Sequence, residues 1–255
     1  MTPNEFKALK GKRKISTLTC YDYSFAQALD SAGIDAILVG DSMAMVLLGH
    51  PDTKSIGLRE MLEHTKAVCR GAKSTLVIAD MPIGTYEDSR AAMQNASLFM
   101  QAGAHAVKIE GAKSEEARAL VAADIPVMGH LGLLPQTAQD YKVQGKTPEA
   151  AEKLLREAKA LDDAGVFAIV LECVPASLAE KITESVSVPT IGIGAGPDCD
   201  GQILVLYDLL GLYGDAAPKF VKVYADLREQ TALAVRRYKN EVEGGVFPDE
   251  SHSYK

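Results

Sequence analysis

The chain alternates between short, uninterrupted apolar runs and longer stretches in which apolar residues recur with a helical period. "AILVGDS" (36–42), "STLVIADMP" (74–82) and "FAIVLECV" (167–174) are three of the apolar runs. Runs without apolar–polar alternation are typical of parallel strands that are covered on both faces. The pattern predicts strands at 15–22, 36–42, 74–82, 106–111, 126–132, 167–174 and 189–196, and an eighth strand within 201–211.

Amphipathic segments follow most of these strands. They predict helices at 23–33, 58–71, 89–103, 114–124, 148–165 and 176–186, and a closing helix at 219–245. Several of these helices end in glycine, the residue that left-handed C-caps favour. A repeated strand–helix unit without a linker predicts an α/β fold, with one closed (β/α)8 TIM barrel over residues 1–255 and a short tail at about 243–255. An open doubly wound sheet is the alternative, but "TCYDYSFA" after the first strand lacks the Gly-rich turn of that fold.

Composition and charge narrow the class of protein. The chain has 255 residues, 47% of them hydrophobic, and a net charge of −7, so we expect no nucleic-acid partner. No apolar run is long enough to span a membrane, and the N-terminus lacks the apolar core of a secretory signal, so we expect no membrane partner. The cysteines at 20, 69, 173 and 199 form no C-x-x-C pair. Unpaired cysteines suit the reducing cytoplasm.

Polar residues interrupt the pattern where the predicted strands end, which is the face on which TIM-barrel active sites form. These residues are Asp22, Asp41, Ser42, Asp80, Lys108, Glu110, His130 and Glu172. Asp41, Asp80 and Glu110 come from the second, third and fourth strands, so their side chains should converge on one side of the barrel mouth. Clustered carboxylates repel one another unless a cation or protons intervene. Oxygen ligands without a His/Cys cluster favour a hard ion such as Mg²⁺.

The remaining strand-end residues have both chemical and structural interpretations. Lys108 and Glu110 lie two apart on one strand, so both side chains point the same way. Lys108 is expected to hold an anionic substrate group or to stabilise an oxyanion, and a structural ion pair with Glu110 is the alternative. Glu172 is expected to act as a general base opposite the three acids, and a buried, paired acid is the alternative. His130 is expected to face the same pocket, although a lone histidine is often a core residue.

The glycine-rich stretch "GIGAGPDCDG" (192–201) has two interpretations. Loops after the seventh and eighth strands of such barrels often bind phosphate. Glycines also allow tight turns without steric cost, and we favour this second interpretation. Taken alone, the residues predict a divalent-metal barrel enzyme that can form an enolate, and they name no substrate.

Several motifs carry a resemblance to a known family. From about residue 14 to the tail, the chain resembles the ketopantoate hydroxymethyltransferases in "LTCYDYSFA", "LVGDS", "ADMP", "AVKIEG", "GHLGLLPQ", "YKVQG", "LECVP" and "IGIGAG" followed by "DGQILV". The resemblance implies a barrel of the phosphoenolpyruvate/pyruvate-using type. It also implies hydroxymethyl transfer from 5,10-methylenetetrahydrofolate to 3-methyl-2-oxobutanoate through a Mg²⁺-stabilised enolate. The products would be 2-dehydropantoate and tetrahydrofolate, in the pantothenate biosynthesis of the cytoplasm, and the assembly would be a homodecamer.

The resemblance also assigns roles to the strand-end residues. It implies that Mg²⁺ is surrounded by Asp41, Asp80 and Glu110. It implies that the keto acid is bound by Asp41, Ser42, Asp80, Lys108 and His130. Glu172 would accept the proton from the substrate. These are the residues that the strand ends had already indicated.

Two loops depart from the family pattern. "TAQD" at 137–140 is shorter than expected before "YKVQG", and "PDTKSIGL" at 51–58 differs from the usual sequence. Both loops are expected near the barrel mouth, where they would affect folate contacts more than the chemistry. A lyase or mutase of the same barrel group, acting on oxaloacetate-like or phosphonopyruvate-like acids, is the rival enzyme. Such enzymes typically carry a cysteine in a "KRCGH"-like loop, which this chain lacks; a barrel that only binds a metabolite is the non-enzymatic alternative.

Overall fold

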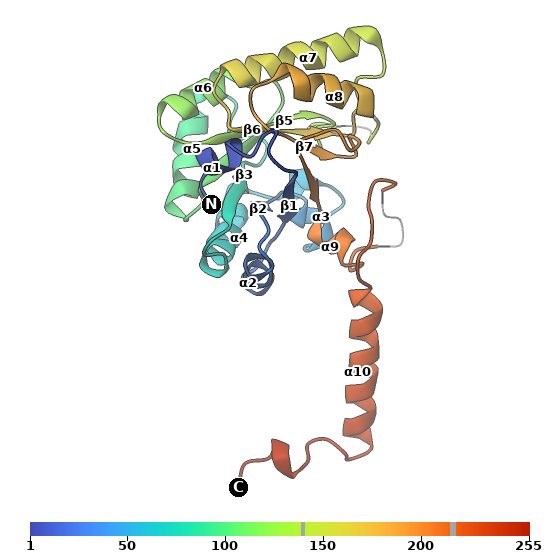
Figure 1. Ribbon diagram of the computed structural model, residues 1–255. Coiled ribbons are helices and arrows are strands. Elements are labelled where there is room, and N and C mark those ends of the chain that lie inside the picture. The colour runs from blue at the N-terminus through green and yellow to red at the C-terminus, as the bar shows by residue number, and fades with distance from the viewer. Residues whose placement is uncertain (139–140, 215–217) are drawn as a thin grey trace. The chain divides into compact units, whose positions relative to one another are not determined.

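Eight parallel strands close into a barrel in the computed structural model, which describes residues 1–138, 141–214 and 218–255 (Figure 1). Each strand pairs with the next along the chain, and β8 pairs with β1. The strands are β1 (Ile15–Thr19), β2 (Ala36–Val39), β3 (Leu76–Asp80), β4 (Ala106–Glu110), β5 (Val127–Gly132), β6 (Ala168–Glu172), β7 (Thr190–Ile193) and β8 (Gly201–Leu204). The predicted closed barrel is confirmed, and the open sheet is excluded.

The apolar runs form strands because both of their faces are covered. Every position of β2, β3 and β4 is buried. Side chains from the strands meet inside the barrel in one core that includes Ile15, Leu38, Ile78, Met128 and Val170. This apolar core lies directly beneath the polar residues at the strand ends.

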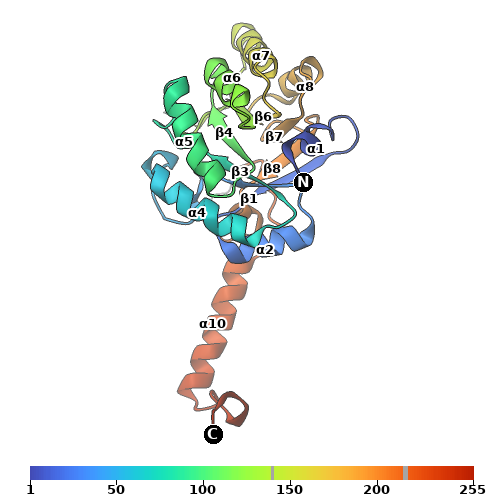
Figure 2. The same cartoon turned by 90° about the vertical axis from the view of Figure 1, so that its left-hand side faces the viewer.

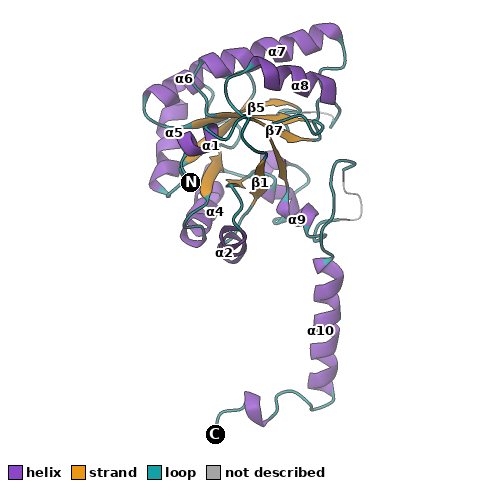
Figure 3. Ribbon diagram, viewed as in Figure 1, coloured by secondary structure: helices purple, strands orange, loops and turns teal. Residues whose placement is uncertain are grey.

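Helices surround the strands on the outside (Figures 2 and 3). The longer ones are α2 (Tyr23–Ala32), α4 (Leu58–Gly71), α5 (Ser89–Gln101), α6 (Ser114–Ala122), α7 (Pro148–Asp163) and α8 (Ala176–Ser185). Two short helices that the sequence did not predict, α3 (Met43–Val46) and η1 (Thr53–Ser55), lie between β2 and α4. Gly33 ends α2 with a φ of +74°, as its predicted C-cap role requires.

A short N-terminal helix, α1 (Pro3–Lys7), also went unpredicted. The Thr2 hydroxyl accepts a hydrogen bond from the Glu5 N–H at 3.2 Å, and a Glu5 carboxylate oxygen accepts one from the Thr2 N–H at 2.7 Å. This capping box fixes the start of the helix. Phe6 is fully buried and packs edge to face on Phe167, with ring centroids 5.7 Å apart. The helix thereby adds its one buried side chain to the barrel core.

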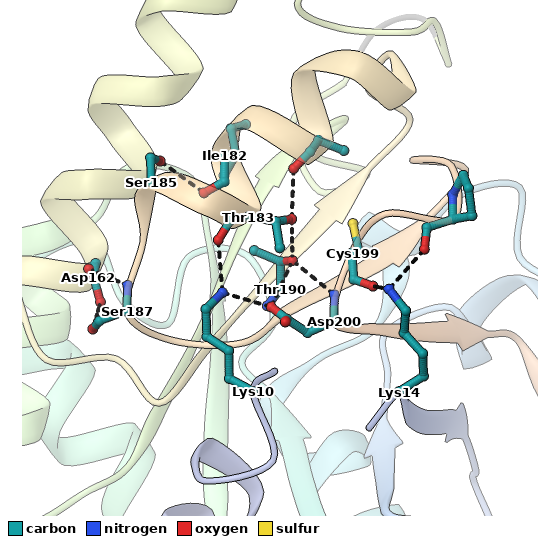
Figure 4. A network of polar contacts seen from close by, with 12 residues as sticks. Lys10, Lys14, Asp162, Ile182, Thr183, Ser185, Ser187, Thr190, Cys199 and Asp200 are labelled. Atoms are coloured by element: carbon teal, nitrogen blue, oxygen red, sulfur yellow. Dashed lines mark hydrogen bonds and ion pairs between the residues drawn. The ribbon is translucent and has the colours of Figure 1, made fainter. Parts of the chain in front are cut away.

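Charged side chains tie the segment after α1 to the amino-terminal ends of β7 and β8 (Figure 4). Lys10 Nζ donates to the Thr183 carbonyl and to Asp200 Oδ2, both at 2.8 Å. The same Asp200 oxygen accepts from the Thr190 N–H at 2.9 Å. Lys14 Nζ donates to the carbonyls of residues 197 and 199. This network lies at the end of the strands opposite the predicted site, where residues serve stability.

The chain divides into two compact units, 1–205 and 206–255, and the whole barrel lies in the first. The second unit contains α9 (Leu206–Leu209), α10 (Leu227–Glu243) and η2 (Glu250–His252). The predicted closing helix at 219–245 is wrong at its start, because Asp226 accepts a hydrogen bond from the Glu229 N–H and caps α10 there. No side chain of α10 is buried. The prediction of a single domain over 1–255 stays a prediction.

The described helices include none that is both long and apolar enough to cross a membrane.

Candidate active site

The strand register brings most of the predicted site residues side by side at the carboxyl ends of the strands. Asp80 on β3 pairs in register with Lys108 on β4, and Glu110 on β4 pairs with His130 on β5. Glu172 is the last residue of β6, next to β5. A continuous row of ionisable side chains therefore lines one part of the barrel mouth.

Lys108 lies buried among the carboxylates. Its Nζ is 2.9 Å from Asp80 Oδ1 and 3.5 Å from Glu110 Oε1. Burial lowers the pKa of Lys108, but the negative charges of its carboxylate neighbours outweigh burial and raise that pKa above its usual value. The ammonium group stays charged, and its closest partner is Asp80. The Lys108–Glu110 ion pair considered from the sequence is therefore one contact within a larger cluster that also includes Asp80.

His130 connects Glu110 to Glu172. Its Nδ1 lies 3.1 Å from Glu110 Oε1, and its Nε2 lies 3.2 Å from Glu172 Oε2. Burial and the Lys108 charge lower the pKa of His130, but the two carboxylates outweigh them and raise it to about 9. The Nδ1 contact with Glu110 is a hydrogen bond, and the Nε2 contact with Glu172 is an ion pair without hydrogen-bond geometry. The Glu172 side chain keeps 16% of its surface exposed, whereas that of His130 is almost fully enclosed.

Asp41 contributes a buried carboxylate oxygen that the described residues leave without a hydrogen bond, Oδ2. Burial raises the pKa of Asp41 well above its usual value, and the charges of Asp80 and Glu110 raise it further. The Asp41 N–H donates to Asp80 Oδ2 at 3.3 Å, which places the Asp80 carboxylate against the Asp41 main chain. An unsatisfied buried carboxylate is costly, and a hard cation with oxygen ligands would satisfy it.

The three acids do not form a closed metal cage in this conformation. Within the described ranges, no three His, Cys, Asp or Glu side chains are gathered as a ready metal site. Lys108 supplies the positive charge among the carboxylates instead. The assignment of Asp41, Asp80 and Glu110 as metal ligands stays a prediction, and their oxygen chemistry fits Mg²⁺.

Ser42 lies at the edge of the cluster, immediately before α3. Its Oγ is 2.9 Å from the Tyr21 hydroxyl, which in turn is 2.7 Å from Thr19 Oγ1. A row of hydroxyl groups therefore runs from β1 to Ser42 and orients its side chain. Asp22, the other strand-end acid, caps α2 by accepting from the Phe25 N–H at 2.9 Å, so it serves the helix rather than the cluster.

Two residues of the cluster were missed by sequence analysis, Gln136 and Tyr86. The Gln136 N–H donates to Glu110 Oε2 at 3.2 Å, and the Tyr86 hydroxyl donates to Gln136 Oε1 at 2.5 Å. Both side chains are buried. Gln136 ends the motif "GHLGLLPQ". A single amide in a loop does not indicate a role from sequence alone, because its contact with a carboxylate depends on how the loop folds.

The glycine-rich stretch after β7 is explained by packing. A Cβ at Gly192 would lie 3.0 Å from Cys199 Sγ, and a Cβ at Gly196 would overlap the Ala176 side chain. Gly196 also has a φ of +81°. These glycines permit close approach and a tight turn, which supports the interpretation favoured from the sequence.

The comparison with known families decides the chain's membership. The model of the ketopantoate hydroxymethyltransferase family matches residues 1–250. The chain belongs to the ketopantoate hydroxymethyltransferases. It is 53% identical to 3-methyl-2-oxobutanoate hydroxymethyltransferase of Syntrophobacter fumaroxidans, over 100% of this chain and 93% of the relative. It is 51% identical to the enzyme of that name from Nitratidesulfovibrio vulgaris, over 100% of this chain and 85% of the relative. The predicted family and the prediction that the chain is a hydroxymethyltransferase are confirmed.

Solved structures show the same barrel at low sequence identity. A 2,3-dimethylmalate lyase aligns with a TM-score of 0.63 at 18% identity, covering 100% of this chain and 92% of that one. Phosphonopyruvate hydrolase in complex with oxalate and Mg²⁺ aligns with a TM-score of 0.63 at 16% identity, covering 99% and 93%. These structures share the fold of this ketopantoate hydroxymethyltransferase family member, and at such identity they carry no argument about its reaction.

The two loops that depart from the family pattern contact each other. Lys54 Nζ, in the 51–58 loop, donates to the Ala138 carbonyl of the 137–140 loop at 3.1 Å. Asp52 caps η1 by accepting from the Lys54 N–H at 3.0 Å. Residues 139 and 140 of the shortened loop lie outside the described residues. The two loops whose sequences depart from the family pattern are therefore in direct contact.

Proposed function

We propose that this chain transfers a hydroxymethyl group from 5,10-methylenetetrahydrofolate to 3-methyl-2-oxobutanoate, giving 2-dehydropantoate and tetrahydrofolate for pantothenate biosynthesis. The observation that carries the proposal is the buried cluster in which Lys108, Asp80 and Glu110 are joined through His130 to Glu172. Such a cluster provides both a seat for an anionic keto acid and a carboxylate that can take a proton. The names of the close relatives support the choice of substrate.

A divalent cation fits the acidic side of the cluster. Asp41, Asp80 and Glu110 would hold Mg²⁺, and the unsatisfied Asp41 oxygen is the observation that favours this. When bound, Mg²⁺ would polarise the substrate carbonyl and make the adjacent C–H more acidic. Support also comes from the donor set, because the three acids at the carboxyl ends of β2, β3 and β4 offer only oxygen atoms.

The chain's own side chains would orient the keto acid. The ammonium of Lys108 would bind the developing enolate oxygen, where a positive charge is worth most in a water-poor site. Asp41, Ser42, Asp80 and His130 would complete the seat, with Ser42 aligned by Tyr21. The buried Met43 that follows Ser42 offers apolar surface for the substrate's methyl groups.

Glu172 would carry out the proton transfer. Its carboxylate would take the proton from C3, the C–H electron pair would form the C2–C3 double bond, and negative charge would collect on the keto oxygen beside Lys108. Water would hydrolyse 5,10-methylenetetrahydrofolate by breaking the bonds from its methylene carbon to N5 and N10; the water oxygen would stay on that carbon as formaldehyde, and the two nitrogens would take the protons to give tetrahydrofolate. C3 would then bond to the formaldehyde carbon, the C=O π pair would move onto the formaldehyde oxygen, and that oxygen would take a proton and become the product hydroxyl. Contact with His130, whose Nε2 lies 3.2 Å from Glu172 Oε2, would fix the position of this carboxylate.

Hydrogen exchange tests the first half of this reaction. Proton NMR of 3-methyl-2-oxobutanoate in D₂O with enzyme and Mg²⁺, without folate, should show loss of the C3–H signal, and EDTA should abolish that loss. Glu172→Gln should still bind the keto acid by calorimetry but lose exchange. If exchange fails in the native enzyme both with and without tetrahydrofolate, the substrate assignment is wrong. Retained exchange in Glu172→Gln would move the base to another residue.

We further propose that the chain forms a homodecamer in the cytoplasm, as the family resemblance implies. Supporting self-association, α10 exposes Leu233, Val235, Tyr238 and Val242. Light scattering coupled to size exclusion gives the mass directly, and a monomer at micromolar concentration would contradict the proposal. The four free cysteines are compatible with a reducing compartment.

A further inference from the structure

Gln136 uses both its main chain and its side chain inside the cluster. Its N–H donates to Glu110 Oε2 at 3.2 Å, and its side-chain Nε2 donates to the Met81 carbonyl at 3.0 Å. With only 1% of its surface exposed, Gln136 connects a loop after β5 to Met81, which follows β3, and to Glu110 at the end of β4.

Tyr86 determines which way the Gln136 amide faces. Its hydroxyl donates to Gln136 Oε1 at 2.5 Å and accepts a longer bond, 3.4 Å, from the Glu110 N–H. Because Oε1 accepts from Tyr86, the NH₂ group faces the Met81 carbonyl. In this orientation the amide oxygen accepts from a hydroxyl group and the amide nitrogen donates to a carbonyl oxygen, so each contact is a favourable hydrogen bond.

We propose that Gln136, oriented by Tyr86, is a positioning residue that holds the Glu110 carboxylate in place for the cation and the keto acid. The inference rests on the proposed function, since it concerns the same site. The side chain anchors the loop, and the anchored loop keeps its main-chain N–H on the Glu110 carboxylate. Groups that hold ligating carboxylates in this way typically affect metal affinity or activity by about 10–100-fold.

The arrangement makes specific demands on residue type. Gln136→Glu keeps the size but replaces the NH₂ donor with a carboxylate oxygen, which would face the Met81 carbonyl oxygen. The replacement therefore introduces repulsion at the point where the donor had contacted an acceptor, and it adds a negative charge beside Glu110. Tyr86→Phe removes a single oxygen atom and leaves Gln136 Oε1 and the Glu110 N–H without their partner. The milder variant is useful because it perturbs the packing least.

Mg²⁺ binding without turnover is the decisive measurement. Isothermal calorimetry with Mg²⁺ alone should show about 10-fold weaker binding for Tyr86→Phe and about 100-fold weaker binding for Gln136→Glu. Tyr23→Phe and Gln101→Glu are the matched controls, because both residues are exposed on outer helices, and they should bind Mg²⁺ as the native chain does. In the D₂O exchange assay, Tyr86→Phe should raise the Mg²⁺ concentration at half-maximal rate while the rate at saturating Mg²⁺ stays within about 3-fold.

The outcomes separate this inference from the proposed function. Absence of exchange in the native enzyme would count against the proposed function, and calorimetry would still test the inference. Unchanged Mg²⁺ affinity in Tyr86→Phe would overturn the positioning role, even if its melting temperature fell, because a purely structural role predicts that combination. If Gln136→Glu does not fold, Tyr86→Phe alone decides.

Discussion

Gly132→Ala should push the carboxyl end of β5 away from Glu172, the proposed base at the end of β6. Gly132 pairs in register with Glu172 and has a φ of +97°, a left-handed conformation that L-residues avoid. A Cβ added there would overlap the Glu172 carbonyl oxygen and lie 2.9 Å from Val174 Cγ1. The carbonyl belongs to the backbone, so it cannot rotate away as a side chain would. The two strand tips must separate, and the 2.8 Å hydrogen bond from the Leu133 N–H to Glu172 would be strained or lost.

The cost has two physical parts. The left-handed backbone costs about 1–2 kcal/mol for alanine, and the forced separation adds the usual cost of overpacking, about 1–3 kcal/mol. Together these predict a loss of about 2–5 kcal/mol in the free energy of unfolding, or a fall in melting temperature of about 4–20 °C for a domain of this size. Displacing Glu172 by about 1 Å would also slow proton abstraction about 100-fold.

Gly11→Ala is the matched control for the backbone part. Gly11 has a φ of +70°, but a Cβ there would meet nothing within 4 Å. Thermal denaturation and C3–H exchange should be measured on both variants. Gly11→Ala should lose only about 1–2 kcal/mol and exchange normally. If Gly132→Ala exchanges at the native rate, the position of the Glu172 backbone does not govern the chemistry, and the reasoning fails.

Three further substitutions separate function from stability. Asp41→Asn should raise the melting temperature of the metal-free chain, because burial and neighbouring charges disfavour the ionised carboxylate, and should weaken Mg²⁺ binding in calorimetry; unchanged Mg²⁺ affinity would remove Asp41 from the ligand set. Burial raises the pKa of Asp35, but hydrogen bonds from Arg13 and Ser16 outweigh it and lower that pKa overall. Asp35 therefore stabilises the fold above its unfolded pKa of about 3.9, and this contribution disappears as pH falls through the lowered folded pKa. Asp35→Asn should then cost about 1.5–3 kcal/mol at pH 7 and much less near pH 3 in urea unfolding, and a pH-independent cost would contradict the assignment. Lys10→Met should lower the melting temperature and leave C3–H exchange unaltered, whereas slowed exchange would show that the amino-terminal network reaches the site.

The barrel was predictable because its strands are buried on both faces, and such strands appear in the sequence as uninterrupted apolar runs. The same regularity made the strand-end residues visible: Asp80 and Glu110 end β3 and β4, and Glu172 ends β6. Strand order then placed them together without knowledge of any distance. The pattern of the strands thus carries most of the information about which polar residues meet.

Short elements and loop-borne contacts were not predictable in the same way. α1 has only five residues and one buried side chain, although the Thr2–Glu5 capping box with Pro3 at its first position is a usable signal. The start of the last helix was placed too early because its cap, Asp226, is one acid among several polar residues. Gln136 and Tyr86 matter only because a loop folds over Glu110, and hydrophobic periodicity does not describe how loops fold.

The Lys10–Asp200 network has a consequence for how this enzyme can change over generations. Its hydrogen bonds join the N-terminal segment to the starts of β7 and β8, and in the part of the chain that the structure describes they share no side chain with the acidic cluster. Mutations at the amino-terminal end of the barrel can therefore change stability almost independently of mutations at the mouth, which change the chemistry. A lineage under heat could strengthen the residue 10–14 segment without retuning its chemistry, and a lineage facing a new acid could alter the mouth while the amino-terminal end preserves the fold.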